Sequence, residues 1–422
     1  MVIALLPLGC DTQDGPEWDI PVRSQPQTVQ FEVDANGSPM VLADVAMNYG
    51  TKARLEEYDQ KYRTLNVQAV LYSPMNGAWD GRGFRNLQAY YGQSQLVRDA
   101  EGGLRVAVWN RDRLIVYARS GADWTAKTAG ALPEPLREYG FSSRFPGGGV
   151  NMALMGDSGW QCVSQDYNHP QSMVVSNTGA RIILDSNQQW TPLAFFPGKS
   201  VNRLLATVPA ADSIGKDSLQ RFRSNLVCYS WNLDRGDSSV RKQWIDTSGA
   251  FFSVDPYSVA GEARFHAYSG SDSLVDFALR GNDFVRIGRI DLVMKDTAGV
   301  DSVYRFRGGA AGPDGCLHSL VVYGPDPSSP EGYLYGSSCR TGTDSLKFPP
   351  ETRIPGVGAG TPIMRFAGDG SPMILFEFEK RSGPIYKEDG SFQAGDDFPG
   401  PAWLYLARLR GAKWEWEQVA AY

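Results

Sequence analysis

Two stretches of the chain combine aromatic rings with arginines in a way that suits ligand binding. Exposed rings stack on the apolar faces of sugars, and guanidinium groups pair with carboxylates. The residues are Trp79, Arg82, Arg85 and Tyr90 within residues 76–92, and Arg137, Tyr139 and Arg144 within residues 131–149. This composition predicts a surface for a glycan or a protein partner, although any single ring could instead pack into a small core formed by its own loop.

Enzyme signatures are weak in comparison. The chain has three histidines, none at a metal-ligand spacing from another, and it lacks the G-x-S-x-G, phosphate-loop and H-E-x-x-H motifs. Glycoside hydrolysis would need two acids across a cleft. Candidate acids are Asp44, Asp80, Asp166, Glu377 and Glu379, a set expected by chance among 47 acidic residues. We therefore expect a binding module without cofactor or metal; a glycoside hydrolase or polysaccharide lyase is the alternative.

The scaffold for these residues is plainest between Ser94 and Thr128. Four short runs rich in Val, Ile, Tyr and Trp are separated by Gly, Asp and Asn turns, which is the pattern of strands and hairpins. The expected strands are 94–99, 104–109, 113–119 and 124–128. A four-stranded antiparallel meander of this size is one blade of a β-propeller.

The rest of the chain repeats this pattern, which predicts an all-β fold. A small/Asp/Asn-Gly turn followed by an apolar strand recurs, and a Trp near the last strand, where it can fill the space between blades, recurs at Trp79, Trp124, Trp190, Trp244 and Trp414. Seven repeats fit, and six or eight blades stay open. The repeat bounds are 24–88, 89–138, 139–198, 199–248, 249–299, 300–356 and 357–422.

Two insertions occupy equivalent places in neighbouring blades. Residues 48–66 in the first repeat and 380–401 in the last both connect a second strand to a third. In a propeller such loops share a face with the crossovers between blades. We expect the insertions and the longest crossovers, residues 76–92 and 131–149, to form one loop-rich binding face.

A further set of arginines lies in or beside the expected first strands, which line the central channel of a propeller. Arg98, Arg203 and Arg365 are the main members, and Arg264 and either Arg305 or Arg307 also belong to it. Because alternate side chains of a strand point the same way, several could converge and attract a carboxylate or sulfate. The alternative is that they bond carbonyls and acids of neighbouring blades.

The N-terminus resembles the end of a bacterial lipoprotein signal peptide. An apolar run, Val2–Leu8, ends in Gly9 and Cys10, the residue that would carry the lipid. A basic leading segment is missing, and an apolar tail with an incidental cysteine is the alternative. We expect residues 1–23 to be an anchor remnant and linker, and residues 24–422 to be one propeller domain. The expected location is the bacterial cell envelope, as an outer-membrane lipoprotein or a secreted protein.

Four later cysteines permit two disulfides in an exported chain. Antiparallel pairing around residues 324–332 would set Cys316 opposite Cys339, which predicts a bridge between them. Cys162 and Cys228 could pair with each other or be buried free thiols.

The repeats resemble the sialidase-like and related β-propeller repeats of exported bacterial proteins. That family marks its turns with S-x-D-x-G-x-x-W, of which Ser120-Gly-Ala-Asp-Trp124 keeps only part, and no full copy exists. The resemblance implies a propeller but places none of the family's catalytic residues. The net charge of −6, without a basic run, argues against nucleic acid as a partner. We expect a monomer that meets a membrane only through its lipid.

Overall fold

The structure is a computed structural model in which every regular element of the described residues is a β-strand. The described residues are 24–47, 67–75, 77–84, 94–98, 103–109, 113–120, 123–131, 151–154, 160–164, 172–176, 181–185, 191–196, 198, 200–209, 224–232, 240–247, 251–259, 262–269, 273–291, 294–295, 301–302, 305–313, 316–323, 332–338, 353–355, 362–379, 385–386, 392–393, 402–411 and 413–422.

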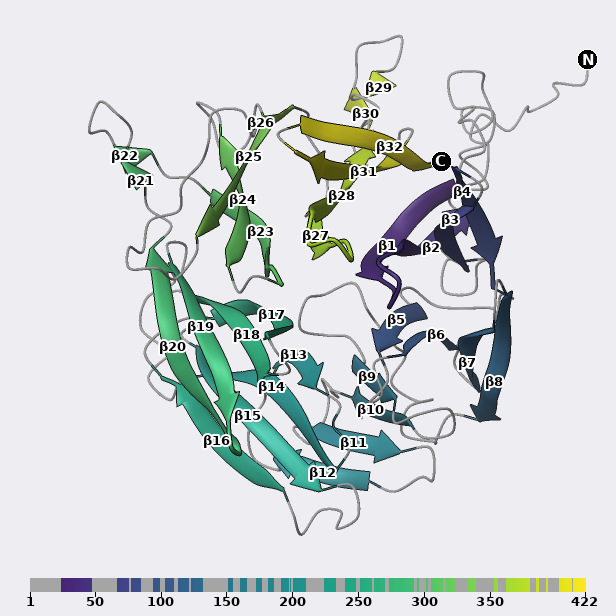
Figure 1. The fold of residues 1–422 in the computed structure, drawn as a ribbon. Helices are drawn as coiled ribbons and strands as arrows, with labels where there is room; N and C mark the ends of the chain where they lie inside the picture. Colours follow the sequence, from purple (N-terminus) through teal and green to yellow (C-terminus); the bar gives the residue numbers. More distant parts are fainter. Residues whose placement is uncertain are drawn as a thin grey trace, which may run out of the picture.

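Within these ranges, seven four-stranded antiparallel sheets stand around a common axis (Figure 1). Blade 1 is β1 (Ser24–Val33), β2 (Pro39–Met47), β3 (Val67–Met75) and β4 (Ala78–Gly83); blade 2 is β5 (Ser94–Arg98), β6 (Leu104–Trp109), β7 (Arg113–Ser120) and β8 (Asp123–Ala131); blade 3 is β9 (Asn151–Leu154), β10 (Trp160–Ser164), β11 (Ser172–Ser176) and β12 (Arg181–Asp185).

The remaining blades follow in chain order. Blade 4 is β13 (Thr191–Phe196), β14 (Val201–Pro209), β15 (Ser224–Asn232) and β16 (Arg241–Asp246); blade 5 is β17 (Phe251–Val259), β18 (Glu262–Ser269), β19 (Ser273–Arg280) and β20 (Asp283–Asp291); blade 6 is β23 (Arg305–Ala311), β24 (Leu317–Tyr323), β25 (Gly332–Ser338) and β26 (Arg353–Pro355); blade 7 is β27 (Ile363–Phe366), β28 (Pro372–Glu379), β31 (Ala402–Arg410) and β32 (Lys413–Ala421). Two short hairpins lie between strands: β21 (Met294–Lys295) with β22 (Asp301–Ser302), and β29 (Ile385–Tyr386) with β30 (Phe392–Gln393).

The first strands of the blades form a closed inner ring. Contacts run from β1 to β5, β9, β13, β17, β23 and β27, and then from β27 back to β1. The predicted β-propeller of four-stranded blades is confirmed, and seven is the number of such sheets in the described residues. Among the described residues, each blade takes its four strands from one stretch of the chain, and no strand is shared between the first and last blades. Side-chain packing between blades 1 and 7 must therefore hold the ring closed.

The second blade matches its sequence pattern closely. The strands expected at 94–99, 104–109, 113–119 and 124–128 are β5 to β8, with differences only at the ends. Alternation is clearest in β7, where Leu114, Val116 and Ala118 are buried while Ile115 and Tyr117 between them are less so.

The boundary between the third and fourth repeats was wrong. Residues 191–196 were assigned to the third repeat, but they form β13, the innermost strand of blade 4. Arg203 therefore lies on β14, the second strand, and not on an innermost strand; Arg264 likewise lies on β18, the second strand of blade 5. The error has a physical cause, since an apolar run that fits a last strand fits a first strand equally well.

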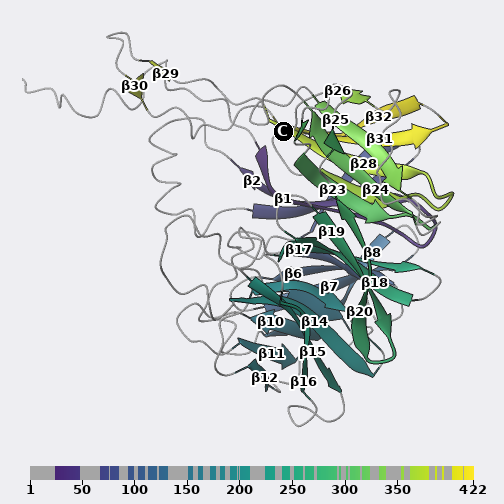
Figure 2. The same cartoon turned by 90° about the vertical axis from the view of Figure 1, so that its left-hand side faces the viewer.

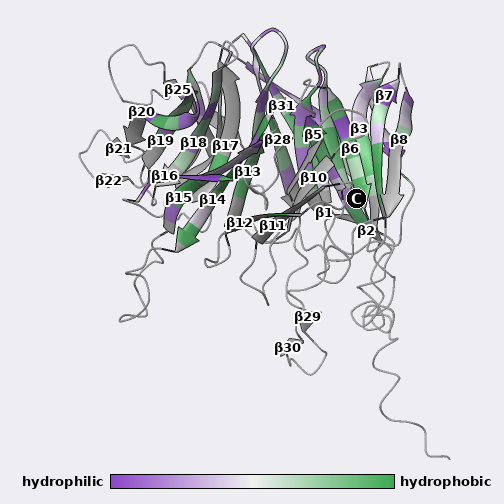
Figure 3. Ribbon diagram, turned by 90° about the horizontal axis from the view of Figure 1, so that it is seen from below, coloured by the Kyte–Doolittle hydropathy of each residue, from purple (hydrophilic) through white to green (hydrophobic). Residues whose placement is uncertain are grey.

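The strand order fixes what lies on each face of the ring. Turns from a first strand to a second, and from a third to a fourth, share one face, which we call the turn-bearing face. Connections from a second strand to a third, and between blades, share the opposite face, which we call the insertion-bearing face. The β29–β30 hairpin belongs to the last such connection, and Figures 2 and 3 show it standing clear of the blades on one side. Residues 48–66, the first of the two insertions, lie outside the described residues.

The recurrent turn has the same backbone geometry in blades 1 and 7. In blade 1 the Asp34 N–H donates to the Ser38 carbonyl at 2.9 Å, and the Gly37 N–H donates to the Asp34 carbonyl at 3.0 Å. The corresponding bonds from Ala367 to Ser371 and from Gly370 to Ala367 are both 2.9 Å. Gly37 and Gly370 have φ of 78° and 83°, a region that favours glycine, which explains why glycine recurs at this point of the repeat.

Buried apolar side chains pack between neighbouring blades, and Figure 3 shows hydrophobic residues along the strands of the blades. One cluster joins blades 1 and 2 and includes Met40, Leu42, Leu96, Val106 and Trp124. Others join blades 3 and 4, blades 4 and 5, and blades 6 and 7. Since a fully buried Val, Leu or Phe contributes about 1.5–3 kcal/mol, these clusters supply the main force that holds the ring together.

Candidate functional site

The seam between blades 1 and 7 carries both insertions. β2 ends at Met47 and β3 begins at Val67, while β28 ends at Glu379 and β31 begins at Ala402. Strands β2, β28 and β31 contribute side chains to one buried cluster at the seam, and β3 packs against it. That cluster contains Phe31, Val33, Val41, Ala43, Val45, Met373, Leu375, Leu404, Leu406 and Val419, with Val70, Tyr72, Trp79 and Tyr422 packed against it. The two insertions therefore start from neighbouring, rigidly packed strands.

Polar contacts reinforce the outer part of this seam. The Trp79 Nε1–H of β4 donates to Glu417 Oε2 of β32 at 3.1 Å. The Tyr422 hydroxyl donates to the Tyr72 hydroxyl at 3.0 Å, and the two rings meet edge to face. Burial raises the pKa of Tyr422, and Tyr72 and Glu377 raise it further, so this hydroxyl stays protonated. These contacts hold blade 7 on blade 1.

Trp79 and Arg82 were predicted to lie in the crossover of residues 76–92, and this prediction was wrong. Both are on β4, the outermost strand of blade 1. Arg82 Nη1 meets Asp123 Oδ1 of β8 at 2.8 Å, and Arg82 Nη2 donates to the Trp124 carbonyl at 3.4 Å. Trp79 thus joins blade 1 to blade 7, and Arg82 joins blade 1 to blade 2. Both side chains have structural partners in the ring.

The remaining members of the predicted surface, Arg85, Tyr90, Arg137, Tyr139 and Arg144, lie outside the described residues, as do Cys10 and Cys339.

The other recurring tryptophans among the described residues differ in their burial. Trp124 is buried in the cluster between blades 1 and 2, and Trp414 packs against the cluster between blades 6 and 7. Trp244 is the exception, because it is 47% exposed on β16 with Lys242 Nζ 4.4 Å from its ring centroid.

A buried acid marks the boundary between blades 1 and 2 near the insertion-bearing face. Asp44 of β2 is 2% exposed, and its Oδ1 accepts the Ser94 hydroxyl at 2.5 Å while its Oδ2 accepts the Ser94 N–H at 3.3 Å. Gln30 of β1 bridges the same strands, since its amide donates to the Ser94 carbonyl and accepts the Leu96 N–H, both at 2.8 Å. These bonds fix the position of the first residues of β5. The buried Asp44 carboxylate therefore has a structural role, which is to hold Ser94 in place.

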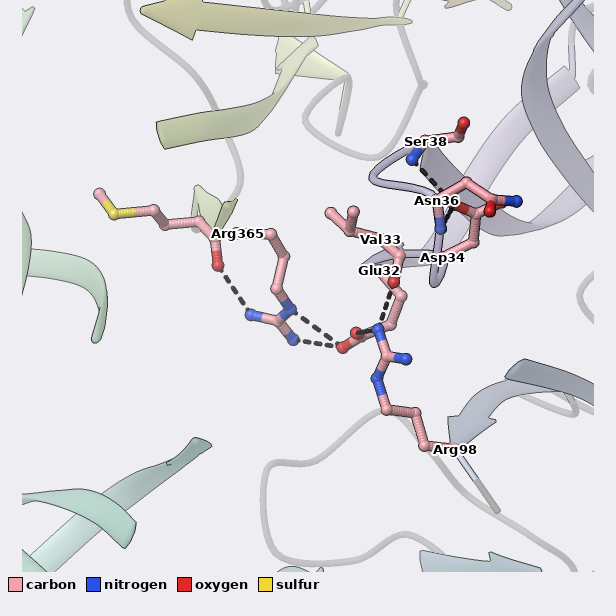
Figure 4. Close-up of polar contacts among 8 residues, drawn as sticks. Glu32, Val33, Asp34, Asn36, Ser38, Arg98 and Arg365 are labelled. Atoms are coloured by element: carbon pink, nitrogen blue, oxygen red, sulfur yellow. Dashed lines mark hydrogen bonds and ion pairs between the residues drawn. The ribbon is translucent and has the colours of Figure 1, made fainter. Parts of the chain in front are cut away.

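Two of the predicted channel arginines meet at a single carboxylate (Figure 4). Arg365 of β27 places Nε 2.9 Å and Nη2 2.8 Å from Glu32 Oε1, and Arg98 of β5 places Nη2 3.3 Å from Glu32 Oε2. Glu32 is on β1, between these two strands in the inner ring. We call these three residues the Glu32 cluster. It lies toward the turn-bearing face, because each residue stands near the end of a first strand.

Backbone contacts fix the direction of both guanidinium groups. Arg365 Nη1 donates to the Met364 carbonyl at 2.8 Å, and Arg98 Nη2 also donates to the Val33 carbonyl. The side chains remain 42% exposed for Arg98 and 37% for Arg365, against 21% for Glu32. Exposed ion pairs contribute only about 0–1 kcal/mol to stability. Arg203, the third of the main channel arginines predicted from the sequence, is on β14 and is not a member of this cluster.

Sequence reasoning missed Glu32, although a signal was available. Along β1, Phe31 and Val33 belong to the buried seam with blade 7, whereas Gln30 and Glu32 alternate with them and bond blade 2. A charged residue inside an apolar first strand is the mark of such an inner position. The neighbouring Asp34 has its own partners: its Oδ1 accepts the Asn36 and Ser38 N–H groups, both at 2.8 Å, and its Oδ2 meets Arg119 at 2.6 Å.

The cysteines fall into two classes. Cys316 is disulfide-bonded, and its predicted partner, Cys339, lies outside the described residues. Cys228 is free and buried, which excludes the Cys162–Cys228 pair. Burial raises the pKa of the Cys228 thiol to about 12 despite the nearby Arg203, so this thiol is protonated and unreactive.

The described histidines are internal to blades 5 and 6. His266 Nδ1 lies 3.4 Å from Asp276 Oδ1 on the adjacent strand, and His318 Nδ1 contacts the Tyr335 hydroxyl. Within the described part of the chain, no three His, Cys, Asp or Glu side chains gather as metal ligands. In the same residues, no helix is long and apolar enough to cross a membrane.

Comparisons with known proteins name no family for this chain. No family model and no curated protein sequence matches it. Among solved structures, dihydro-heme d1 dehydrogenase NirN matches with 10% identity and a TM-score of 0.42, covering 96% of this chain and 77% of that one. A protein from Lactobacillus plantarum matches with 11% identity and a TM-score of 0.42, covering 84% and 94%.

A lectin is also among the similar structures. A mutant of the Aleuria aurantia lectin in complex with Fucα1-6GlcNAc matches with 11% identity and a TM-score of 0.33, covering 78% of this chain and 95% of that one. With TM-scores this low, nothing about the ligands of this chain follows from these similarities.

Proposed function

We propose that this protein is a β-propeller binding module whose insertion-bearing face holds a glycan or a protein partner. The observation that carries the proposal is the shared seam: both insertions leave from neighbouring strands of blades 1 and 7, which pack into one buried cluster. Binding residues tend to sit on loops that a rigid scaffold positions. Both insertions leave from strands of this packed base, which supports a shared binding face.

The residues proposed to contact the ligand are those that follow the ring strands in the two longest crossovers. Arg85 and Tyr90 come after β4, and Arg137, Tyr139 and Arg144 come after β8. Trp79 and Arg82 are not included, because their side chains are bonded to Glu417 and Asp123 of neighbouring blades. Guanidinium and phenol groups suit a ligand with carboxylates or hydroxyls and an apolar face.

The test is a glycan-array screen and a pull-down from envelope extract, followed by titration of the best ligand. The variants are Arg85→Ala with Tyr139→Ala, and Trp244→Ala as the control, which removes an exposed ring from the rim of blade 4. We expect the double variant to weaken binding at least about tenfold, as loss of interface anchors does, and the control to bind as the wild type does. Equal binding by the double variant and the wild type would count against this face.

The alternative is a glycoside hydrolase or lyase with acids on the same face. Asp44 gives it little support because Ser94 encloses that carboxylate. Asp80 of β4 lies opposite Ser73 of β3, toward the turn-bearing side. Turnover of uronic-acid or sialic-acid polymers by the purified protein would favour this alternative over a binding module.

We also propose that the protein is exported to the bacterial cell envelope and anchored by a lipid on Cys10, the residue that ends the apolar N-terminal run. Palmitate labelling of the expressed chain should depend on Cys10 and vanish in Cys10→Ser. Labelling that persists in this variant, or its absence from the wild type, would reject the anchor.

A further inference from the structure

We propose that Arg203 and Arg241 form a binding site for a compact oxyanion, such as a carboxylate or sulfate group, where blades 4 and 5 meet on the turn-bearing face. This site is independent of the proposed function, which uses the opposite face. It is based on the guanidinium group of Arg203, whose Nε is buried but forms no hydrogen bond within the described part of the chain.

Strand register places the two arginines on one surface of blade 4. Arg203 of β14 lies directly opposite Ser230 of β15, and Ser230 lies opposite Arg241 of β16. Opposed residues share a face and adjacent strands are about 4.8 Å apart, so the two arginines stand roughly 10 Å apart with Ser230 between them. Leu205 and Cys228, an opposed pair farther along the same face, belong to the cluster between blades 4 and 5. The arginines therefore lie on the surface turned to blade 5.

The two arginines also stand at the same end of the seam between these blades. β14 begins at Val201, two residues before Arg203, and β16 begins at Arg241, so both arginines follow turns of the turn-bearing face. β20 of blade 5 begins at Asp283, and Arg241 Nη2 lies 2.8 Å from Asp283 Oδ1 and 3.1 Å from its Oδ2. The Arg241 side chain is 52% exposed, which leaves it accessible to a ligand.

Arg241 has an acid as a partner, whereas Arg203 has none among the described residues. The blade 5 side chains in the cluster beside Arg203 include Phe265, Phe277 and Phe284, which offer no carboxylate. A charged group that is partly removed from water without a partner lowers the stability of the fold. An oxyanion would supply the missing charge-assisted hydrogen bonds, for which the planar guanidinium fork is suited.

The charges of the site act on one common neighbour, the Cys228 thiol. Burial raises the pKa of this thiol most; Arg203 and Arg241 lower it, and Asp283 raises it. Because the interaction between charges weakens with distance, three charged groups that all act on one buried sulfur lie near one another. Two of these three groups are positive.

The adjoining turns do not cancel this positive charge. Counted from the sequence, residues 197–203, 230–241, 259–264 and 279–283 form the turns and strand ends of blades 4 and 5 on this face. The basic residues in these ranges are Lys199, Arg203, Arg235, Arg241, Arg264 and Arg280, and the acidic residues are Asp234, Asp237, Glu262 and Asp283. The whole chain has a net charge of −6, so this end of the seam has the opposite sign and would attract an anion.

The experiment is calorimetric titration of the full chain with sodium sulfate and with sodium malonate, at constant ionic strength set with sodium chloride. The wild type should bind at least one of these anions saturably, with one site per chain. Arg203→Gln and Arg241→Gln should each weaken binding about tenfold or more, as expected for loss of a charge-assisted hydrogen bond. Arg410→Gln is the matched control: it breaks an ion pair with Glu415, at 3.2 Å, on blade 7 and should bind as the wild type does.

Two further measurements distinguish a binding residue from a structural one. Asp283→Asn releases Arg241 from its acid and should strengthen binding severalfold, which also serves if an arginine variant fails to fold. Arg203→Gln should not lower the free energy of unfolding, because it removes a charge that has no partner in the described residues.

Three results would overturn the site. They are no saturable binding of either anion, wild-type affinity in Arg203→Gln, and a marked loss of stability in Arg203→Gln, which would show that Arg203 has a structural role. Ligand binding on the insertion-bearing face should be the same in all these variants, so failure of this site and failure of the proposed function can be told apart.

Discussion

Gly37 of the first blade and Gly368 of the last lie backbone against backbone. A Cβ on Gly37 would come within 2.6 Å of the Gly368 nitrogen and 2.8 Å of its Cα. The two residues belong to the equivalent turns that end β1 and β27, so duplicated turns of the repeat touch where the ring closes. Together with Glu32–Arg365, Trp79–Glu417 and Tyr72–Tyr422, this contact replaces the shared strand that the chain does not use for closure.

Gly37→Ala should destabilise the protein through this contact. The residue has φ of 78°, which costs an alanine about 1–2 kcal/mol, and the new Cβ must also push away the backbone of Gly368. We expect a total loss above about 3 kcal/mol, measured by denaturant unfolding.

Gly77→Ala is the matched control for this variant. Its φ is 82°, but nothing lies within 4 Å of the position of its Cβ. It should therefore cost only the backbone strain, about 1–2 kcal/mol. Equal losses in the two variants would mean that the Gly37–Gly368 contact contributes nothing to closure.

The sequence predicted strands and turns well because those depend on local chemistry. Leu104–Trp109 and the Asp-Ala-Asn-Gly turn at residues 34–37 carry alternation and glycine in the residues themselves. Blade membership is different, since it depends on which strand starts a sheet. The sequence of Thr191–Phe196 fits a first strand as well as a last strand of a blade. For that reason Arg203 was predicted to lie on a first strand, whereas it lies on a second strand.

Side-chain roles were harder to predict than strands. Trp79 and Arg82 are residue types that suit a ligand-binding surface, but both form contacts between blades. Their partners are Glu417, 338 residues away along the chain, and Asp123, 41 residues away. Arg98 and Arg365 were predicted to converge, and alternation along β1 sets Glu32 apart from its apolar neighbours, but its pairing with both arginines follows only from the place of β1 between β5 and β27. Pairing across the ring is set by closure, which no local pattern records.

The tryptophans offer a direct test of packing between blades. Trp124 is 7% exposed within the cluster of blades 1 and 2, so Trp124→Ala should cost about 3–5 kcal/mol. Trp244→Ala removes a ring that is 47% exposed and contacts Lys242, and should cost under about 1 kcal/mol. Denaturant unfolding of both variants measures the difference, and similar losses would show that the tryptophan mark does not distinguish packed from open positions.

Cys228 should be inert in the folded protein. Only its thiolate would react, and burial raises the pKa of its thiol to about 12. We expect iodoacetamide not to alkylate Cys228 of the folded protein at pH 8 over hours, and to alkylate it fully in guanidinium chloride. Mass spectrometry of the modified peptide measures both. Labelling of Cys228 in the native protein at the rate of the unfolded chain would contradict its place between blades 4 and 5.

The seam should weaken at alkaline pH. Burial raises the pKa of Tyr422 and of Tyr72, so the folded protein keeps hydroxyl protons that the unfolded chain releases near pH 10. The unfolded state then binds fewer protons, and the free energy of unfolding falls as pH rises through 10, by up to about 1.4 kcal/mol per pH unit for Tyr422. Below about pH 9 this contribution to stability is fully present.

Tyr422→Phe should flatten that decline between about pH 9.5 and 11, because the buried hydroxyl that holds the proton is gone. At pH 7 the same variant should lose about 1 kcal/mol, the worth of its hydrogen bond to Tyr72. Tyr405→Phe is the control, since that hydroxyl donates to Gln418 at an exposed position and should leave the decline as in the wild type. The measurement is the free energy of unfolding of the wild type and both variants across this pH range. If the wild type and Tyr422→Phe lose stability equally with pH, the Tyr72–Tyr422 pair is not the cause of the alkaline decline.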